Sequence, residues 1–361
     1  MGKSAVKGLF YICPIAATFI LGAITIVAAF SGNMAPVDSV IMPLLGLAVP
    51  VLPIVNLITA LCWALARKRW ALIPLVAFFC NWGYLTSVFQ LHLPKDKTPA
   101  GKYLKIATYN IHNFGGEITG YSCKEIARYM QQEGVDVLCF QEFGDNSDFP
   151  TDSIRRVLSH WSHALIPSED SVKGVLPIAV FSRYPLANHR FITYQHSSNC
   201  SMMCDVVMGT DTIRLINNHL QTTSVSQKRR KWERELATDD TRREVQAAKD
   251  AAGTLHENFM KRATQTYVIS HYAKTSPYPV LLCGDFNSIP SSYTYHHLRK
   301  TLKDGFRTAG NGYMYTYRYA KRMLRIDYIF HSPSLKGIEY YSPDLDLCSD
   351  HNPVIMEVEI Q

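Results

Sequence analysis

Three consecutive stretches of uncharged, mostly apolar residues open this chain, and they limit what it can fold into more than any other feature. The stretches cover residues 8–37, 40–66 and 70–94. Each exceeds the roughly 20 residues that a helix needs to cross about 30 Å of hydrocarbon. A cleaved signal peptide has a shorter apolar region of about 7 to 15 residues, and three buried core helices in succession would show a polar face. The sequence therefore predicts three transmembrane helices, which make residues 1–94 a membrane anchor.

The basic residues beside these stretches predict their direction. Lys3 and Lys7 precede the first stretch, the loop around Asp38 contains no Lys or Arg, and residues 67–69 (Arg-Lys-Arg) join the second stretch to the third. Basic residues in short loops favour the cytoplasmic side of a membrane. The N-terminus is therefore expected in the cytoplasm. Three crossings then place the remainder on the extracytoplasmic side of a cytoplasmic (inner) membrane, as in a multi-pass protein.

Residues 103–361 have the pattern of one α/β domain, which a linker of residues 95–102 connects to the anchor. Residues 104–110 and 135–141 are predicted as strands, and residues 121–133 as a helix between them. A long amphipathic helix is expected within residues 226–272, with a break near Gly253 and a basic, solvated start at residues 228–231. Further short strands are predicted at 177–181, 205–208, 212–217, 279–282, 324–330 and 354–359.

The charge balance argues against a nucleic-acid partner. The chain carries 37 basic and 30 acidic residues, and all but five of the basic residues and one of the acidic residues follow residue 94. Domains that bind duplex DNA usually have a larger basic excess, because each neutralised phosphate needs a Lys or Arg. A nucleic-acid substrate is therefore less favoured.

Polar side chains recur where the predicted strands end, and together they suit chemistry on phosphates. Loops at one end of a sheet are where such groups converge. Carboxylate and amide oxygens are ligands for Mg²⁺ or Mn²⁺, and the cysteines lack the spacing of a zinc site. Imidazoles donate to phosphate or move protons near neutral pH. Without a Ser or Cys nucleophile motif, water is the expected nucleophile. The strand-end residues are Asn110, Glu142, Asn217, His219, Asp285, Asn287, Asp327, Asp350 and His351.

The sequence blocks around these residues resemble the signature motifs of the endonuclease/exonuclease/phosphatase superfamily. In chain order they are TYNIHNF, FQEF, NNHLQ, GDFNSIP, RIDYIF and SDHNPV, within roughly residues 103–361. The resemblance implies an α/β fold, a four-layered αββα sandwich of two packed mixed sheets flanked by helices, here preceded by three transmembrane helices. It places the active site at one edge of the two sheets.

The resemblance also implies a divalent-metal site. Glu142 resembles the principal metal ligand of the family, and Asn110 and Asp350 resemble residues that complete or flank the site. Some nucleases of the family carry an acidic residue two positions after the strand-end Asn, where this chain has His112. The departure puts a second metal position in doubt and makes His112 a candidate for contact with substrate.

The catalytic roles follow from the same motifs. His219 resembles a phosphate-binding or acid group, and Asn287 resembles a residue that orients the phosphate or the attacking water. His351, held by Asp327, resembles the imidazole that bonds the scissile phosphate or serves as base. Asp285 resembles the water-activating carboxylate, so Asp285 and His351 are assigned jointly to removal of the proton.

These features favour a membrane-anchored phosphoesterase that depends on Mg²⁺ or Mn²⁺ and hydrolyses a phosphate ester or pyrophosphate outside the cytoplasm. The anchor resembles that of bacterial family members related to teicoplanin-resistance phosphatases, which suggests a lipid-linked substrate. The alternatives are a sphingomyelinase-like phosphodiesterase, a metal-dependent endonuclease or exonuclease, and an inactive binding module, against which the complete set of motif residues argues. Arg183 and Arg325 also recur in the blocks and are expected in structural ion pairs.

Overall fold

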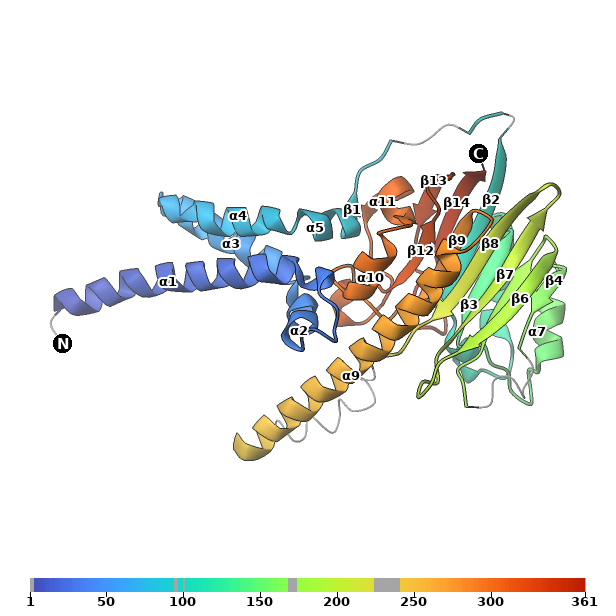
Figure 1. The fold of residues 1–361 in the computed structure, drawn as a ribbon, viewed down its shortest axis with the longest axis horizontal. Coiled ribbons are helices and arrows are strands. Elements are labelled where there is room, and N and C mark those ends of the chain that lie inside the picture. Colours follow the sequence, from blue (N-terminus) through green and yellow to red (C-terminus); the bar gives the residue numbers. More distant parts are fainter. Residues whose placement is uncertain (1–2, 94–96, 100, 168–173, 224–240, 361) are drawn as a thin grey trace.

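The computed structural model describes residues 3–93, 97–99, 101–167, 174–223 and 241–360. Figure 1 shows an elongated molecule, in which helices of the N-terminal part project away from a body built around two packed sheets. The C-terminus lies at the end of a strand in this body, far from the N-terminus.

Two six-stranded mixed sheets form the body. The strands of the first are β2 (Lys102–Asn110), β3 (Val137–Gln141), β4 (His163–Leu165), β5 (Ile178–Ser182), β13 (Leu335–Tyr341) and β14 (Val354–Ile360). The strands of the second are β6 (Leu186–Thr193), β7 (Cys200–Met208), β8 (Asp211–His219), β9 (Val280–Asp285), β10 (Lys303–Asp304) and β12 (Asp327–His331). Their orders are β13-β14-β2-β3-β5-β4 and β10-β12-β9-β8-β7-β6. Each sheet contains a parallel pair, β2 with β3 and β8 with β9.

Helices cover the outer faces of both sheets. Apolar side chains of α6 (Tyr121–Gln132) and α7 (Thr151–Val157) pack on the first sheet. Those of α9 (Thr241–Lys274) and α10 (Tyr293–Leu298) pack on the second, and a separate apolar core fills the space between the sheets. This arrangement confirms the predicted α/β class with two packed mixed sheets and flanking helices. Shorter helices are η1 (Ser31–Asn33), η2 (Arg69–Ala71), η3 (His112–Gly116), α11 (Gly305–Ala309) and η5 (Ala320–Arg322).

Every predicted strand overlaps an observed one, but the sequence does not predict β6 and β13, nor the short strands β4 and β10. The strand β6 lies at a sheet edge with a single buried residue, and Gly337 interrupts β13, so neither of these two strands has a clear apolar pattern. The predicted break near Gly253 is wrong, because α9 continues through it. A Cβ added at Gly253 would meet no neighbouring atom, so no close packing depends on this glycine. The basic start predicted at residues 228–231 lies outside the described residues.

The N-terminal helices correct the prediction of three continuous transmembrane helices. Within α1 (Lys3–Ala29) and the turn that follows, residues 12–33 are long and apolar enough to cross a membrane. The second stretch is divided into α2 (Ile41–Ala48) and α3 (Leu52–Leu65), and the third divides between α4 (Leu72–Cys80) and α5 (Trp82–Val88). Each pair is bent by 58°. One continuous helix and two bent pairs are therefore present among the described residues.

The bends have local causes that a count of charges overlooks. Pro50 and Pro53 lie at the first break, and proline lacks the amide hydrogen that continues a helix and clashes with the preceding turn. Asn81 lies between α4 and α5, and its side-chain amide donates to Ala77 O over 3.0 Å, which competes with the helical pattern. Gly83 is the second residue of α5, and glycine has a low helix propensity.

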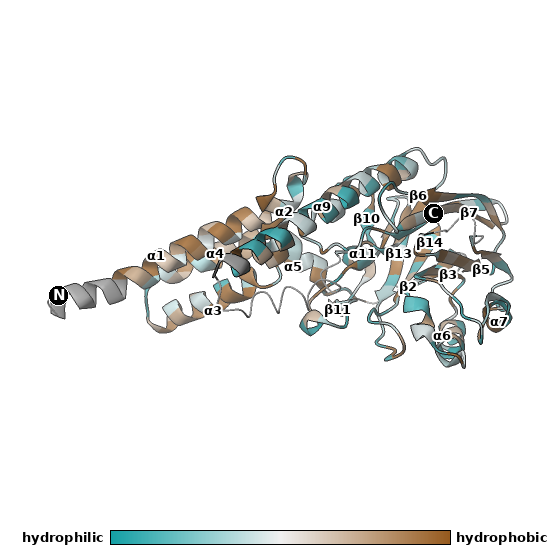
Figure 2. Cartoon of the chain, turned by 90° about the horizontal axis from the view of Figure 1, so that it is seen from below, coloured by the Kyte–Doolittle hydropathy of each residue, from teal (hydrophilic) through white to brown (hydrophobic). Residues whose placement is uncertain are grey.

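Polar side chains join the N-terminal helices to one another. Asn56 Nδ2 donates to Thr25 Oγ1 over 2.7 Å, and Trp63 Nε1 donates to Thr18 Oγ1 over 2.9 Å. Asn56 and Thr25 are fully buried. Interhelical bonds of this kind are typical of helices that pack in an apolar environment. Figure 2 shows α1 mostly in brown, whereas α9 carries many hydrophilic residues.

The body contacts these helices directly. The short strands β1 (Phe89–Gln90) and β11 (Gly312–Tyr313) pair with each other. Ser31 Oγ donates to Ser291 O over 3.1 Å, and Ser291 Oγ donates to Gly46 O over 2.8 Å. The predicted linker of residues 95–102 lies partly outside the described residues, and these contacts show that the body does not depend on it for attachment to the helices.

Candidate active site

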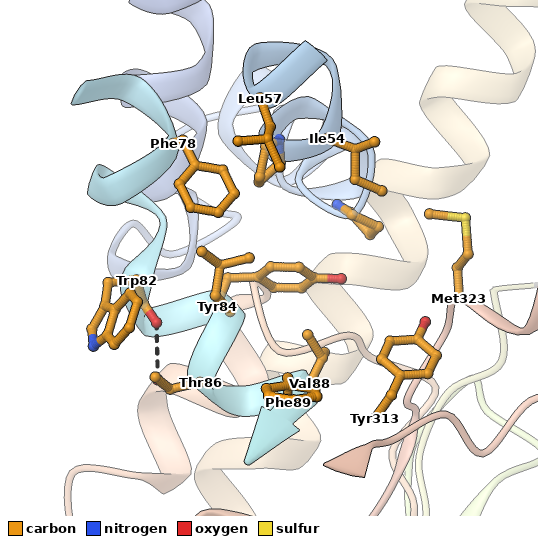
Figure 3. A pocket seen from close by; sticks show the side chains of 13 residues that line it. Ile54, Leu57, Phe78, Trp82, Tyr84, Thr86, Val88, Phe89, Tyr313 and Met323 are labelled. Carbon is orange, nitrogen blue, oxygen red and sulfur yellow. Dashed lines mark hydrogen bonds between the residues drawn. The ribbon is translucent and has the colours of Figure 1, made fainter. Parts of the chain in front are cut away.

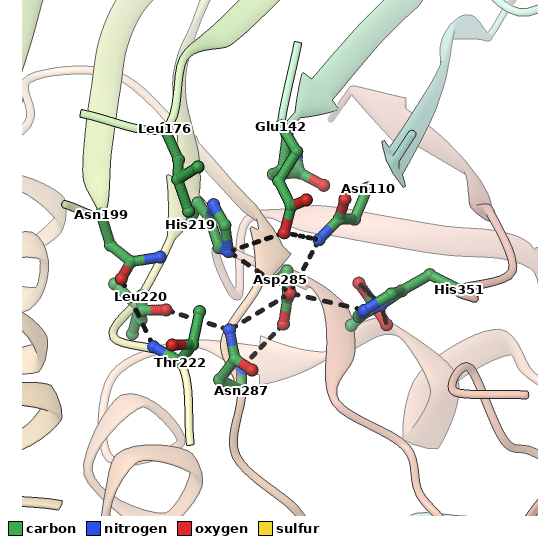
Figure 4. A network of polar contacts seen from close by, with 12 residues as sticks. Asn110, Glu142, Leu176, Asn199, His219, Leu220, Thr222, Asp285, Asn287 and His351 are labelled. Carbon is green, nitrogen blue, oxygen red and sulfur yellow. Dashed lines mark hydrogen bonds and ion pairs between the residues drawn. The ribbon is translucent and has the colours of Figure 1, made fainter. Parts of the chain in front are cut away.

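Polar side chains from both sheets meet at one end of the body. Because β8 and β9 are parallel, their last residues, His219 and Asp285, are direct neighbours in register. Asn110 ends β2 in the other sheet. Figure 4 shows Asn110, Glu142, His219 and His351 pointing toward Asp285. The fold thus assembles residues that are far apart along the chain.

One carboxylate oxygen, Oδ2 of Asp285, lies at the centre of this cluster. Asn110 Nδ2 donates to it over 3.1 Å, and Asn287 Nδ2 donates to it over 3.2 Å. His219 Nε2 and His351 Nε2 each lie 3.7 Å from the same oxygen. The other oxygen, Oδ1, accepts a bond of 2.8 Å from the Asn287 backbone nitrogen. The structure therefore brings four of the predicted residues together around one oxygen atom of a fifth, Asp285.

Glu142 approaches the cluster from the first sheet, directly after β3. Its Oε1 accepts a 3.1 Å bond from Asn110 Nδ2 and lies 3.7 Å from His219 Nε2. Its Oε2 lies 3.2 Å from Nδ1 of His112, an exposed residue. The Asn110 amide therefore bridges the carboxylates of Glu142 and Asp285, and His112 lies at the outer rim.

Asp327 holds the ring of His351. Nδ1 of His351 lies 2.9 Å from Oδ2 and 3.1 Å from Oδ1 of Asp327. A carboxylate accepts, so Nδ1 donates and Nε2 faces Asp285. Burial opposes the charged form of His351, but Asp327 and then Asp285 outweigh it and raise its pKa to about 10. His351 is therefore a protonated donor at neutral pH.

His219 has the opposite character. It is fully buried, and burial lowers its pKa, although Asp285 and Glu142 oppose this shift. Neither ring nitrogen has a hydrogen-bond partner among the described residues. Unpaired buried polar groups cost folding free energy, so a neutral imidazole in this position is suited to bind a group from outside the chain.

The remaining predicted residues take different positions. Asp350 Oδ1 lies 3.9 Å from His351 Nε2, at the edge of the cluster. Asn287 Nδ2 also donates to Leu220 O over 3.0 Å, which fixes its amide beside Asp285. Asn217 lies between the sheets, where its Nδ2 donates to backbone oxygens of β3 and β5. Asn217 therefore joins the two sheets and is not part of the site.

The backbone around the site adopts strained conformations. Glu142 has φ of 49° and Asn287 has φ of 48°, values that cost a non-glycine residue free energy and often occur at functional sites. Gly284, just before Asp285, has φ of 132°, and a Cβ there would lie 1.9 Å from Asn218 O. A glycine at this position therefore lets β8 and β9 approach closely enough to align His219 with Asp285.

Two residues that sequence reasoning overlooks also support the site. Tyr317 packs edge-to-face on His351, with ring centroids 5.3 Å apart. Arg262 of α9 is 2% exposed, and its Nη1 donates to Gln221 O over 2.8 Å and to Thr223 Oγ1 over 3.1 Å. Burial lowers the pKa of Arg262 to about 10. Arg262 thereby fixes the loop that follows β8.

A signal for this support is present in the sequence. Asn258, Arg262 and Gln265 recur at helical spacing, and all three are buried. Gln265 Oε1 accepts a 2.7 Å bond from the Gln221 backbone nitrogen. A polar stripe beside the apolar face of α9 would have indicated a helix that holds a polar loop.

The two arginines expected in structural ion pairs have that role. Arg183 Nη1 lies 3.0 Å from Asp136 Oδ1. Arg325 Nη2 lies 2.6 Å from Asp304 Oδ1, and both of these side chains are fully buried. Both predictions are confirmed.

The donor set of the site suits a hard divalent cation. Ligand atoms of Asp285, Asp327 and His351 all lie within 4.8 Å of one another, and the carboxylate of Glu142 lies nearby, joined to Asp285 through the Asn110 amide. Oxygen donors of this kind are typical for Mg²⁺ and Mn²⁺. The negative charge exceeds that of the single protonated imidazole, so a cation would balance the cluster.

Comparisons with known proteins agree with this geometry. Residues 107–351 match the model of the endonuclease/exonuclease/phosphatase family, and residues 8–88 match a domain of unknown function (DUF8431). No curated protein matches the chain.

Solved structures of other proteins show the same fold. An endonuclease/exonuclease/phosphatase from Beutenbergia cavernae DSM 12333 is 17% identical, with a TM-score of 0.52 and 72% of each chain covered. One from Bacteroides vulgatus is 16% identical, with a TM-score of 0.52 over 72% of this chain and 100% of that chain. Truncated Caenorhabditis elegans TDP2 is 16% identical, with a TM-score of 0.50 over 72% of this chain and 98% of that chain. At these identities the similarity concerns the fold alone.

Proposed function

Because this chain belongs to the endonuclease/exonuclease/phosphatase family, we propose that it hydrolyses a phosphate ester or pyrophosphate of a lipid-linked substrate. We further propose that it is anchored in a membrane, acts outside the cytoplasm and depends on Mg²⁺ or Mn²⁺. The observation that carries the proposal is the position of Asp285 Oδ2, within 3.7 Å of two imidazoles and hydrogen-bonded to two amides.

Glu142 and Asp350 would hold the cation through their carboxylate oxygens, and Asn110 would flank the site by donating to Glu142. A bound Mg²⁺ would supply positive charge that stabilises the negative charge developing on the phosphoryl oxygens. The group formed by Asp285, Asp327 and His351 is less suited to bind it, because Nδ1 of His351 is already bonded to Asp327. The carboxylate of Glu142 lies nearer the outer rim, beside the exposed His112.

The protonation states of the site support separate roles for Asp285 and His351. The raised pKa of His351 makes it a donor, so His351 Nε2–H binds a phosphoryl oxygen of the substrate. Asp285 is then the acceptor that removes a proton from the attacking water. The Asn287 amide and neutral His219 orient the water and the phosphate beside it. No covalent intermediate is required, because water attacks phosphorus directly.

The arrangement of the N-terminal helices supports the proposed orientation in a membrane. If each bent pair counts as one span, the chain crosses three times. The N-terminus and the turn between α3 and α4 lie at the same end in Figure 1, away from the sheets. That turn contains the basic residues 67–69, which favour the cytoplasm. The body then lies outside the cytoplasm and close to the bilayer.

The decisive experiment compares substrates with the detergent-purified full chain. Polyprenyl pyrophosphate, sphingomyelin and DNA are each incubated with Mg²⁺ or with a chelator. We expect Mg²⁺-dependent hydrolysis of the polyprenyl pyrophosphate. Selective cleavage of DNA would replace the proposed substrate class with a nuclease activity.

Substitutions test the residues that carry the reaction. Glu142→Ala and His351→Ala should each reduce hydrolysis by about 10³-fold or more while the fold is retained, because both groups act on charge in the transition state. Matched controls are Glu125→Ala, at an acidic residue of α6 on the outer face, and His189→Ala, at an exposed residue of β6. Wild-type turnover by either site variant would refute the site assignment.

A further inference from the structure

An apolar cavity of about 420 Å³ lies between the N-terminal helices and the body, apart from the cluster around Asp285. Figure 3 shows its side chains arranged around a common space. Sites for small molecules commonly measure about 300–1,000 Å³, so the cavity is large enough for a ligand. Its lining includes Ile54 and Leu57 of α3, Phe78 of α4, Tyr84 of α5, and Tyr313 and Met323 of the body.

The cavity is continuous with the apolar surface of the N-terminal helices. Ile54 is 50% exposed and Leu57 is 49% exposed, although both line the cavity. Trp82 and Phe89, which also line it, are exposed to a similar degree. Trp and Tyr are enriched at the level of lipid head groups. In a membrane, the opening would therefore face lipid near the head-group layer, at the level of a lipid phosphate.

A short path of bonded residues leads from the cavity to the candidate active site. Met323 lines the cavity, and the next residue, Leu324, pairs with Tyr317, which also pairs with His351. Consecutive Cα atoms are about 3.8 Å apart and paired residues about 4.5–5.5 Å apart. The Cα atom of Met323 therefore lies within about 15 Å of that of His351.

The two walls of the cavity are held together by backbone bonds. Met314 N donates to Val88 O over 2.8 Å, and β1 pairs with β11 beside it. Arg325 Nη1 donates to Ser87 O over 2.9 Å. These contacts fix the end of α5 against the segment that leads to His351, so the cavity has a defined position relative to the reactive groups.

We propose that this cavity binds the part of a lipid chain that lies next to the phosphate of the substrate. The lining is mostly apolar, so a hydrocarbon chain fits it. Its polar groups are the hydroxyls of two tyrosines and of Thr86, which donates to Trp82 O, and the indole of Trp82. A protein segment would bring backbone polar groups that this lining leaves unpaired. The proposal rests on the proposed function, and it identifies the substrate class as single-chain lipid phosphates that enter from the bilayer.

The test measures how hydrolysis depends on chain length. Dimethylallyl, geranyl, farnesyl and geranylgeranyl phosphate are assayed with the full chain in mixed micelles. We expect kcat/KM to rise with chain length, by about tenfold or more across the series, because additional buried methylene groups favour binding. A kcat/KM that is independent of chain length would overturn the proposal.

Filling the cavity tests the same idea with matched variants. Leu57→Trp and Ile54→Trp should reduce the ratio of kcat/KM for geranylgeranyl over dimethylallyl phosphate by about tenfold. The controls are Leu61→Trp and Ile58→Trp, which lie on the same helix, are similarly exposed and do not line the cavity. Equal ratios in the cavity variants and the controls would contradict the proposal. Two independent positions keep the test valid if one variant does not fold.

A binding measurement separates this proposal from the proposed function. A farnesyl phosphate that carries a diazirine is cross-linked to the full chain, and labelled peptides are identified. The proposal is supported if peptides that contain Tyr313 or Met323 are labelled in the wild type and are not labelled in the Leu57→Trp variant. This result supports the cavity as the lipid-binding site even if no substrate is hydrolysed. In that case the proposed function fails alone. Labelling of peptides outside the cavity overturns the assignment of the cavity. The assignment is also overturned if a phospholipid displaces the diazirine probe and unlabelled farnesyl phosphate does not.

Discussion

Two buried groups of charged side chains lie close together at the start of β12, and they differ in how well their charges balance. Arg325 donates to both carboxylate oxygens of Asp304, over 2.8 and 2.6 Å. It also donates to Ser87 O and to Tyr340 Oη. Tyr295 Oη donates to Asp304 over 2.7 Å. One positive and one negative charge are therefore balanced, and hydrogen bonds reach both of them, although Nε of Arg325 has no partner among the described residues.

The group around Asp285 is not balanced in this way. Asp285 and Asp327 are buried beside Glu142, while His351 is protonated and His219 is neutral and unpaired. Burying unbalanced charge costs folding free energy. The comparison teaches that buried charge by itself does not indicate function. A balanced pair joins parts of the fold, whereas an acidic excess with an unpaired imidazole fits the proposed site for a cation and a phosphate.

The largest expected effect comes from removing charge at the unbalanced site. Asp285→Asn should lower kcat by about 10³-fold or more, since the acceptor for the water proton is lost. Its melting temperature should remain close to that of the wild type, because the loss of repulsion among the carboxylates offsets weakened hydrogen bonds. Activity assays and thermal unfolding measure the two effects. A large loss of stability would assign Asp285 to the same class as Asp304.

Arg325→Leu should have the opposite profile. It leaves Asp304 buried without its cation, which costs about 3–5 kcal/mol of folding free energy. Denaturant unfolding measures this loss. The double variant Arg325→Leu/Asp304→Asn should recover a large part of it, because neither charge is then buried alone. A double variant that is no more stable than the single one would show that the pair is not the source of the effect.

Asp327→Asn sharpens the comparison through pH. In the wild type, the His351 pKa of about 10 keeps the imidazole protonated below that pH. Without the Asp327 charge, this pKa falls toward the usual value of about 6.5. The decrease of kcat/KM at alkaline pH should therefore begin at a lower pH in the variant. Near pH 9, the kcat/KM of the variant should be lower than that of the wild type by at least about tenfold. A pH profile identical to that of the wild type would show that the protonated imidazole of His351 is not the group that binds phosphate.

The smallest effect is expected where the body meets the N-terminal helices. His296 Nδ1 lies 3.0 Å from Asn33 Oδ1. Burial and the neighbouring Arg299 lower the pKa of His296 to about 4, below the unfolded value of about 6.5. The unfolded chain therefore binds more protons between these values, and stability is lost as the pH falls from about 6.5 toward 4.

The size of this loss is limited by solvent, since His296 is only partly buried, and we expect about 1 kcal/mol. Melting temperatures of the wild type and of His296→Gln, measured near pH 7.5 and near pH 5, provide the test. The decrease on acidification should be smaller in the variant. An equal decrease in both proteins would remove His296 as its cause.

Much of the site was predictable because its residues follow a local pattern. Asn110, His219 and Asp285 end strands, and the ends of parallel strands lie at the same edge of a sheet. The sequence does not reveal that Asn217 faces the space between the sheets, because its direction depends on how the two sheets pack. The role of Arg262 is hidden for a related reason, since α9 reaches the loop after β8 only in the folded chain.

The N-terminal part shows the same limit. Its apolar character and basic turn are properties of composition, whereas the bends near Pro50 and Asn81 depend on local breakers that a search for charge does not weigh. The contacts of Ser31 and Ser291 join residues that lie in different parts of the chain. No periodicity or spacing encodes such a contact.

Composition and strand periodicity were sufficient to predict the α/β class, the apolar N-terminal part and the polar side chains at strand ends, because each of these depends on residues close together in the chain. The protonation of His351, the central position of Asp285 Oδ2 and the cavity beside Tyr313 depend on distances between segments that meet only after folding. Electrostatic and packing energies vary with those distances, so only the three-dimensional arrangement could establish them.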